Sequence, residues 1–191
     1  MTNKQLNTDL LDNAIVFAVR AHAGTERKGK GFPYIVHPLE AVAIVATLTS
    51  DQELLAAAAL HDTIEDTSVT KEVISREFGH RVADLVMAET DVVPTGQSKE
   101  DSWHTRKQVA IERLRVAPRD VKIVALGDKL SNMRAIARDY ANLGDELWNL
   151  FRVKDRDSHA WHYHGLVEAL RDLEGTPAFD EFETLVKQIF D

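Results

Sequence analysis

Apolar residues recur every three or four positions along most of the chain, which is the spacing of one face of a helix. This spacing predicts helices at about 8–22, 38–48, 51–60, 70–79, 80–89, 102–115 and 119–139. The tail from about 142 to 190 reads as three more helical pieces, with breaks near Asp155, Gly175 and Pro177. No segment alternates polar and apolar residues for long enough to predict a strand. We therefore expect an all-α fold of about eight or more helices.

Glycine and proline gather in few places, which predicts loops at about 24–33 and 94–101. The third predicted helix is different from the others, because residues 54–60 are apolar on every face. A helix without a polar face is normally central and packed on all sides. No internal repeat or low-complexity linker divides the chain, so we expect one domain.

The composition excludes several classes of protein. The 191 residues include 23 Lys and Arg against 31 Asp and Glu, a net charge of −8, which disfavours binding to nucleic acid or to an acidic membrane surface. There is no cysteine, so disulfides, thiolate-bound metals and a thiol nucleophile are excluded. No run approaches the roughly 20 apolar residues of a membrane span, and residues 1–9 lack the features of a signal peptide. A cytoplasmic location is expected.

The segment from His61 to Asp66 carries one imidazole and three carboxylates directly after the apolar run. Unpaired charge beside a hydrophobic core is unfavourable, and a divalent cation would remove that penalty. On a continuing helix Asp62 lies three positions before Glu65 and four before Asp66, so these carboxylates share a face. His61 points to the same end. We therefore expect His61 and Asp62 to reach one ion.

Further ligands for that ion must come from other parts of the chain. His37 stands at the start of the second predicted helix, and Asp128 ends the very apolar run 121–128. Two imidazoles and two carboxylates suit Mn²⁺ or Fe²⁺, and less well Zn²⁺. Each residue has a second interpretation when taken singly: Asp128 could pair with Lys129 or Arg134, and His37 could neighbour a helix cap.

Three stretches carry a resemblance to a known family. They are residues 21–40, 56–66 and 121–134, which read AHAGTERKGKGFPYIVHPLE, AAAALHDTIED and VKIVALGDKLSNMR. In order and spacing they resemble the HD-domain hydrolases of the RelA/SpoT family. Because 191 residues leave no room for a synthetase region, the stand-alone small alarmone hydrolases are the most similar members.

The resemblance implies one HD-type helical bundle over residues 1–191, with a motif-bearing core at about 8–140 and a helical extension at about 141–191. It also implies a manganese-dependent 3′-pyrophosphohydrolase that cleaves ppGpp or pppGpp into pyrophosphate and GDP or GTP, an activity of the stringent response. Fe²⁺ or Zn²⁺ could replace manganese.

Particular residues receive roles from the same resemblance. The metal ligands would be His37, His61, Asp62 and Asp128. Glu65 and Asp66 match the pair that orients and deprotonates the attacking water. Four further residues match substrate contacts: Arg27 and Lys28 near base and phosphates, Asn132 near the ribose, and Tyr163 as an aromatic wall.

Some of these substrate contacts have other interpretations. The basic loop around Arg27 and Lys28 could be a solvated charge run, and it is one residue longer than the common family pattern. Tyr163 could equally pack in the core. Gly127 stands where the family usually has alanine, before Asp128.

Two other segments attract attention. Residues 103–107 include Arg106 and Lys107 and are a candidate second phosphate contact. Residues 159–164 are rich in histidine, but His162 and His164 are two positions apart and face different ways on a helix, which disfavours a second metal site.

Two other functions stay open at this stage. An HD phosphohydrolase could act on another nucleotide, such as (p)ppApp or a phosphorylated nucleotide cofactor. A non-catalytic protein could bind an alarmone without turnover, although it would need neither Glu65 nor Asp66. In each case the partner is a small nucleotide rather than nucleic acid or membrane, and nothing predicts the oligomeric state.

Overall fold

Helices make up nearly all of the regular structure, as the sequence predicts. The computed structural model describes residues 7–91, 96, 98 and 100–191. Within these ranges there are ten α-helices, two 3-10 helices and one isolated antiparallel bridge between Glu26 and Pro33, with no strand. The all-α prediction is confirmed. The start of the chain and much of the predicted loop at 94–101 lie outside the described residues.

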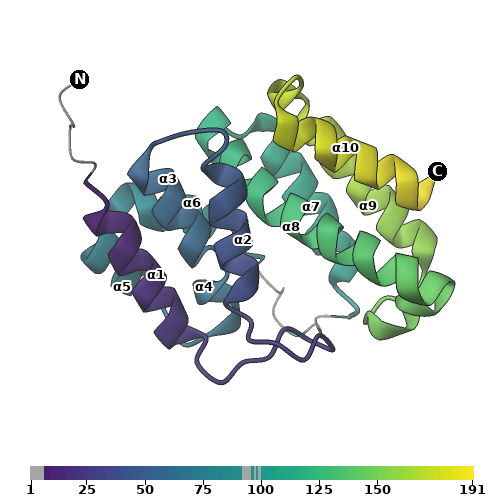
Figure 1. Cartoon of the computed structure of the whole chain (residues 1–191), viewed down its shortest axis with the longest axis horizontal. Helices are drawn as coiled ribbons and strands as arrows, with labels where there is room; N and C mark the ends of the chain where they lie inside the picture. The colour runs from purple at the N-terminus through teal and green to yellow at the C-terminus, as the bar shows by residue number, and fades with distance from the viewer. Residues whose placement is uncertain (1–6, 92–95, 97, 99) are drawn as a thin grey trace.

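Most elements follow one another closely, whereas residues 22–35 form a longer connection (Figure 1). In chain order they are α1 (Asp9–Ala21), α2 (Val36–Val45), α3 (Gln52–Leu60), α4 (Thr63–Asp66), α5 (Lys71–Phe78), α6 (His80–Glu89), α7 (Trp103–Val116), α8 (Arg119–Leu143), η1 (Gly144–Leu150), α9 (Arg156–Ala169), η2 (Arg171–Leu173) and α10 (Pro177–Phe190). The predicted breaks in the tail are real: the Asp155 side chain caps α9, and Pro177 begins α10 after Thr176.

The expectation that residues 61–66 continue the third helix is wrong. The helix α3 ends at Leu60, and His61 and Asp62 form a turn before the short α4. Side chains compete for the last carbonyls of α3, since His61 Nδ1 lies 2.8 Å from Ala58 O and Thr63 Oγ1 donates to Leu60 O. The turn directs His61 and Asp62 toward α2 and α8.

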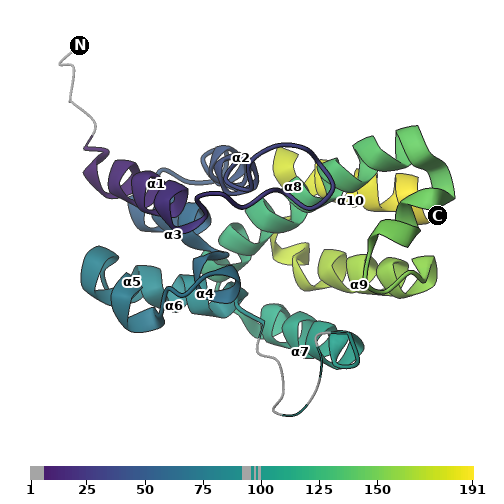
Figure 2. The same ribbon diagram turned by 90° about the horizontal axis from the view of Figure 1, so that it is seen from below.

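The central position predicted for α3 is confirmed. Its residues from Leu54 to Leu60 are all buried, and α1, α2, α6 and α8 pack around it. Buried apolar side chains from α1 through α10 belong to one hydrophobic cluster. Figure 2 shows α1 to α6 gathered on one side of the molecule, while α8 runs outward from them with α9 and α10 alongside.

A close crossing of α2 and α8 sets the position of the acidic residue on α8. At Gly127 an added Cβ would lie 2.7 Å from Val45 Cγ2 and 3.0 Å from the Ala41 carbonyl oxygen. Only glycine allows the two backbones to approach this closely. The next residue, Asp128, is thereby held against the N-terminal part of α2, where His37 lies.

No helix in the described part of the chain is long and apolar enough to cross a membrane.

Candidate active site

Three buried side chains from different helices converge on one point. His37 from α2, His61 from the end of α3 and Asp128 from α8 have ligand atoms that all lie within 4.8 Å of one another. His37 Nε2 is 3.2 Å from His61 Nε2 and 3.1 Å from Asp128 Oδ1. The helices α2, α3 and α8 pack on one another, so the fold itself brings these residues together.

Asp62 adds a second carboxylate to this cluster. Its Oδ2 lies 3.0 Å from His61 Nε2 and 3.5 Å from His37 Nε2. The same oxygen accepts a hydrogen bond from the Tyr34 hydroxyl at 2.6 Å. Burial beside Asp62 raises the pKa of Tyr34, so the hydroxyl stays protonated and donates. All four predicted metal ligands are therefore neighbours.

The hydrogen bonds on the far sides of the rings fix the histidine tautomers. His61 Nδ1 is 2.8 Å from a carbonyl oxygen, which only accepts, so this nitrogen carries the proton. His37 Nδ1 is 2.8 Å from Ser131 Oγ, and Ser131 in turn donates to Glu40 Oε2 at 2.7 Å. His37 Nδ1 therefore donates as well. Both Nε2 lone pairs then face each other and the carboxylates.

This arrangement fits a divalent cation. Two lone pairs and two carboxylates directed at one point repel one another unless positive charge lies between them. Histidines that bind metals usually donate their other N–H to a carbonyl, a carboxylate or water. Here His61 donates to the Ala58 carbonyl, and His37 donates to the Ser131 hydroxyl, which in turn donates to Glu40.

Without a cation, protons compensate for the negative charge. Burial opposes the charged form of His61, but Asp62 and Asp128 outweigh it and raise the pKa of the imidazole well above its usual value. Burial likewise opposes ionisation of the two aspartates, and neighbouring positive groups outweigh it: chiefly His61 for Asp62 and Lys129 for Asp128, so both carboxyl pKa values fall well below their usual range. The cluster is thus built to hold at least one positive charge.

Asp128 also connects to groups outside the cluster. Asn132 Nδ2 donates to Asp128 Oδ1 at 2.6 Å, and Arg27 donates to the Asn132 side-chain oxygen. Lys129 donates to the other Asp128 oxygen and to Glu89 Oε2. The pairing of Asp128 with Lys129 and its place in the cluster are therefore compatible. Arg134 does not compete, because its carboxylate partners are Glu40 and Glu181.

The predicted acid–base pair lines a cavity that opens on this cluster. Glu65 and Asp66, from α4, lie with His37, Asp62 and Asp128 around a cavity of about 630 Å³. The backbone N–H of Asp91 donates to Glu65 Oε2 at 3.2 Å and orients that carboxylate.

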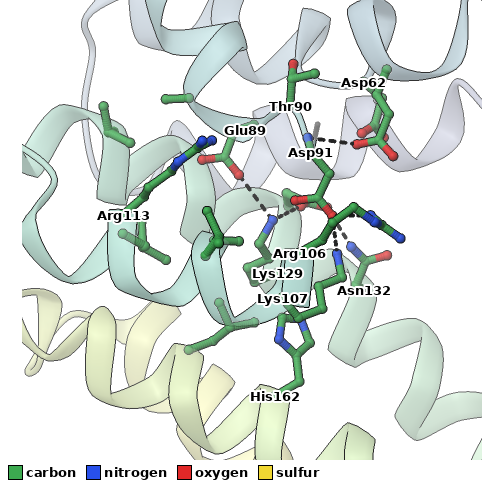
Figure 3. A pocket seen from close by; sticks show the side chains of 18 of the residues that line it. Asp62, Glu89, Thr90, Asp91, Arg106, Lys107, Arg113, Lys129, Asn132 and His162 are labelled. Carbon is green, nitrogen blue, oxygen red and sulfur yellow. Dashed lines mark hydrogen bonds and ion pairs between the residues drawn. The ribbon is translucent and has the colours of Figure 1, made fainter. Parts of the chain in front are cut away.

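Cations from α7 and α8 line the same cavity. Arg106 and Lys107 both bind Asp91 Oδ2, at 2.7 and 2.8 Å, so the candidate phosphate segment 103–107 does reach the site. In Figure 3 these side chains and Lys129 surround Asp91. The cavity therefore carries acidic and basic side chains close together, since Lys129 binds Asp128 of the cluster itself.

An adjoining cavity of about 440 Å³ holds the other predicted substrate residues. Arg27 and Asn132 line both cavities, whereas Lys28 and Tyr163 line only the smaller one. Tyr163 is nevertheless buried and stacks on Phe190 with ring centroids 5.6 Å apart, so packing accounts for most of its surface. The roles of these four residues stay predictions.

Several residues of the site carried no role in the sequence interpretation. Tyr34 lay within the first motif stretch, and Ser131 is three positions after Asp128 on the same helix, so both had a local signal. Asp91 and Glu89 had no such signal in the sequence, because they follow the motif stretch 56–66 by more than twenty residues and reach the cavity only through the packing of α6.

The histidine-rich segment divides between core and surface. His159 Nε2 bonds the Val153 carbonyl oxygen, His162 lines the larger cavity, and the exposed His164 lies 3.3 Å from Asp191. The three imidazoles therefore occupy different surroundings.

Comparison with known proteins agrees with this geometry. The model of the HD domain family matches residues 14–155. The chain is 36% identical over 137 residues to the GTP pyrophosphokinase rsh of Brucella ovis, covering 69% of this chain and 17% of that protein. It is 39% identical over 124 residues to the guanosine-3′,5′-bis(diphosphate) 3′-pyrophosphohydrolase of Haemophilus influenzae, covering 61% and 17%. The chain thus spans about a sixth of the length of these curated relatives.

Two solved structures have the same fold. A metazoan ortholog of SpoT, described as hydrolysing ppGpp, has a TM-score of 0.77 at 23% identity over 96% of this chain and 97% of its own. The protein lmo0812 of Listeria monocytogenes EGD-e has a TM-score of 0.71 at 32% identity over 85% of this chain and 100% of its own. Because the family model spans His37, the His61–Asp62 pair and Asp128 together, the chain belongs to the HD domain family.

Proposed function

We propose that the protein is a metal-dependent phosphohydrolase that removes the 3′-pyrophosphate of ppGpp or pppGpp. The observation that carries this proposal is the convergence of the two Nε2 atoms with Asp62 and Asp128 beside a cavity that also holds Glu65 and Asp66. The names and functions of the relatives support the substrate, since two of them are described as acting on this nucleotide.

The cation site would be formed by His37, His61, Asp62 and Asp128. These ligands suit Mn²⁺, with Fe²⁺ or Zn²⁺ as alternatives. When bound, the ion would lower the pKa of a water molecule and neutralise charge on the phosphoryl group. Tyr34 and Ser131 hold Asp62 and His37 in position for this purpose.

Glu65 and Asp66 would act on the attacking water. One carboxylate takes a proton from the water, and the oxygen of that water bonds to the phosphorus attached to the 3′ oxygen of the ribose. The bond between this phosphorus and the 3′ oxygen breaks, and the 3′ oxygen takes up a proton. The balance is one water consumed, with GDP or GTP and pyrophosphate released. The hydrogen bond from Asp91 N–H keeps Glu65 directed into the cavity.

The nucleoside would lie toward the smaller cavity. Arg27, Lys28, Asn132 and Tyr163 line that space, and the exposed Lys28 stands at its edge. Arg27 is held by Asn132 and lies over the Tyr34 ring, 5.4 Å from its centroid. A planar guanidinium in this position can stack on a base or bind a phosphate. We expect the substrate to be a free nucleotide that the enzyme encounters in the cytoplasm.

A product-resolved hydrolysis assay tests this function. Protein with Mn²⁺ is incubated with ppGpp, ppApp and a phosphorylated nucleotide cofactor, with and without EDTA. We expect pyrophosphate and GDP from ppGpp, and none after chelation. If another nucleotide is cleaved and ppGpp is not, that nucleotide is the substrate. Binding of ppGpp without hydrolysis of any nucleotide would indicate a sensor.

A further inference from the structure

His162 is a buried histidine that the reaction outlined above does not use. It lies on α9 and is 8% exposed, and its Nδ1 has no hydrogen-bond partner within the described ranges. The residue lines the cavity of about 630 Å³ together with three of the four candidate metal ligands, His37, Asp62 and Asp128. A buried nitrogen without a partner destabilises a fold, so its retention at a cavity wall points to a ligand atom that it contacts.

The surroundings of His162 favour an anion. Burial, with Lys107 and Lys129 nearby, lowers the pKa of His162 well below its usual range, so the ring is neutral. In the view of Figure 3 the ring lies beneath these two lysines. Two ammonium groups and a neutral ring nitrogen that can donate together form a surface complementary to a phosphate.

The carboxylates near this surface do not cancel its charge. Asp91 Oδ2 is shared between Arg106 and Lys107, which leaves these three groups with an excess of one positive charge. Lys129 lies between Asp128 and Glu89, and a cation at the cluster would satisfy Asp128 instead. The basic part of the cavity is therefore positive when the metal site is filled.

The two cavities divide the substrate between them. Lys129 and His162 line only the larger cavity, next to the cluster, whereas Lys28 and Tyr163 line only the smaller one. A nucleotide placed with its nucleoside in the smaller cavity and its reacting phosphorus at the cluster must direct the distal phosphate away from the nucleoside. Within the larger cavity, that phosphate would lie against Lys129 and His162, while Lys107 lines both cavities.

We propose that His162, Lys107 and Lys129 form the subsite for the distal phosphate of the 3′-pyrophosphate. The subsite gives the enzyme its preference for a pyrophosphate over a single phosphate at the 3′ position. This assignment rests on the proposed function for the identity of the substrate, but the anion site itself can be measured without turnover.

Calorimetric titration of the Mn²⁺-loaded protein with inorganic pyrophosphate tests the subsite directly. We expect His162→Phe and Lys107→Met each to weaken pyrophosphate binding by about tenfold or more, the effect of one lost charge-assisted hydrogen bond. Orthophosphate, which needs only the metal side, should bind with little change. The matched control is His164→Phe on the same helix, which is exposed and does not line the cavity; it should bind pyrophosphate as the unchanged protein does.

Hydrolysis supplies the second readout. The two variants should lose their preference for ppGpp over the analogue with a single 3′-phosphate, while their melting temperatures and Mn²⁺ affinities stay close to those of the His164→Phe control. If His162→Phe does not fold, the same measurements are made on Lys107→Met and His162→Gln. Unchanged pyrophosphate binding in variants that fold would overturn the subsite, even if ppGpp is hydrolysed. If the variants bind pyrophosphate more weakly but the original protein does not hydrolyse ppGpp, the anion site is supported and the proposed function is wrong.

Discussion

At the scale of single residues, the site depends on which atom carries each proton. His61 Nδ1 faces a carbonyl and His37 Nδ1 faces Ser131, so neither ring can turn its lone pair away from the cluster. Sequence spacing indicated which residues meet, but it contained no information about these tautomers. The His61 contact is local, to a carbonyl three residues earlier, whereas the His37 contact forms only when α2 and α8 have packed.

Glu65 and Asp66 line the cavity but are not among the candidate metal ligands, and we propose that they act on the attacking water. We therefore expect the double substitution Glu65→Gln with Asp66→Asn to reduce kcat by at least about a hundredfold, the usual contribution of general base catalysis. Bound Mn²⁺, measured by metal analysis after gel filtration, should be unchanged. The exposed pair Arg76 and Glu77 lies far from the cavity lining, so Glu77→Gln is a suitable control. Full activity in the double variant would show that the reaction does not require these carboxylates.

Ser131 supports the candidate ligand His37 and contacts Glu40 behind it. Ser131→Ala should weaken Mn²⁺ affinity about tenfold, because partners behind metal ligands typically contribute 10- to 100-fold. Competition with a fluorescent chelator measures the affinity. A second serine–histidine pair, Ser75 with His80 at 2.7 Å, lies on the surface at the α5–α6 junction, and Ser75→Ala is the matched control. Equal affinities in the two variants would contradict a positioning role for Ser131.

At the scale of elements, the approach of α2 to α8 sets the site. The sequence predicted both helices and noted Gly127 as a departure from the family's usual alanine. It could not show that the position faces Val45 and the Ala41 backbone, since that depends on the crossing of two helices far apart in the chain. The break between α3 and α4 was missed for a related reason: side chains of His61 and Thr63 bond the carbonyls that a continuing helix would need.

Gly127→Ala tests this crossing. The new Cβ would meet Val45 Cγ2 at 2.7 Å and the Ala41 carbonyl oxygen at 3.0 Å, so the helices must move apart. We expect a loss of about 1–3 kcal/mol in the free energy of unfolding, as for other overpacked sites, and weaker Mn²⁺ binding. Urea unfolding measures the first effect. Adding Val45→Ala should recover part of the loss, and a Gly127→Ala variant as stable as the original would show that the crossing is not tight.

At the scale of the whole molecule, the tail is connected to the metal site. Arg134 on α8 binds both Glu181 on α10 and Glu40, and Glu40 accepts from the Ser131 that holds His37. The sequence motifs end near residue 140, so this connection could not be foreseen from them. The motif residues and the all-α fold were predictable because they depend on local spacing. The contributions of α6 and of His162 on α9 were not, because they reach the cavity only through packing. The sequence did indicate residues 103–107 of α7 as a candidate phosphate contact, and Arg106 and Lys107 among them line the cavity.

The net charge of −8 has a local counterpart in this arrangement. Part of the negative charge is concentrated at the cluster and at Glu65 and Asp66, while Arg106, Lys107 and Lys129 line the same cavity. A highly charged nucleotide with a divalent cation suits such a cavity. The acidic surface elsewhere does not favour nucleic acid.

The central claim is that one divalent cation at the cluster is required for pyrophosphate release. The most direct measurement compares bound Mn²⁺ and ppGpp turnover in the same samples of the original protein and Asp128→Asn, each before and after EDTA. We predict one Mn²⁺ per chain with pyrophosphate release in the original protein, and loss of both in Asp128→Asn and after chelation. Undiminished pyrophosphate release from the metal-free protein would contradict the account.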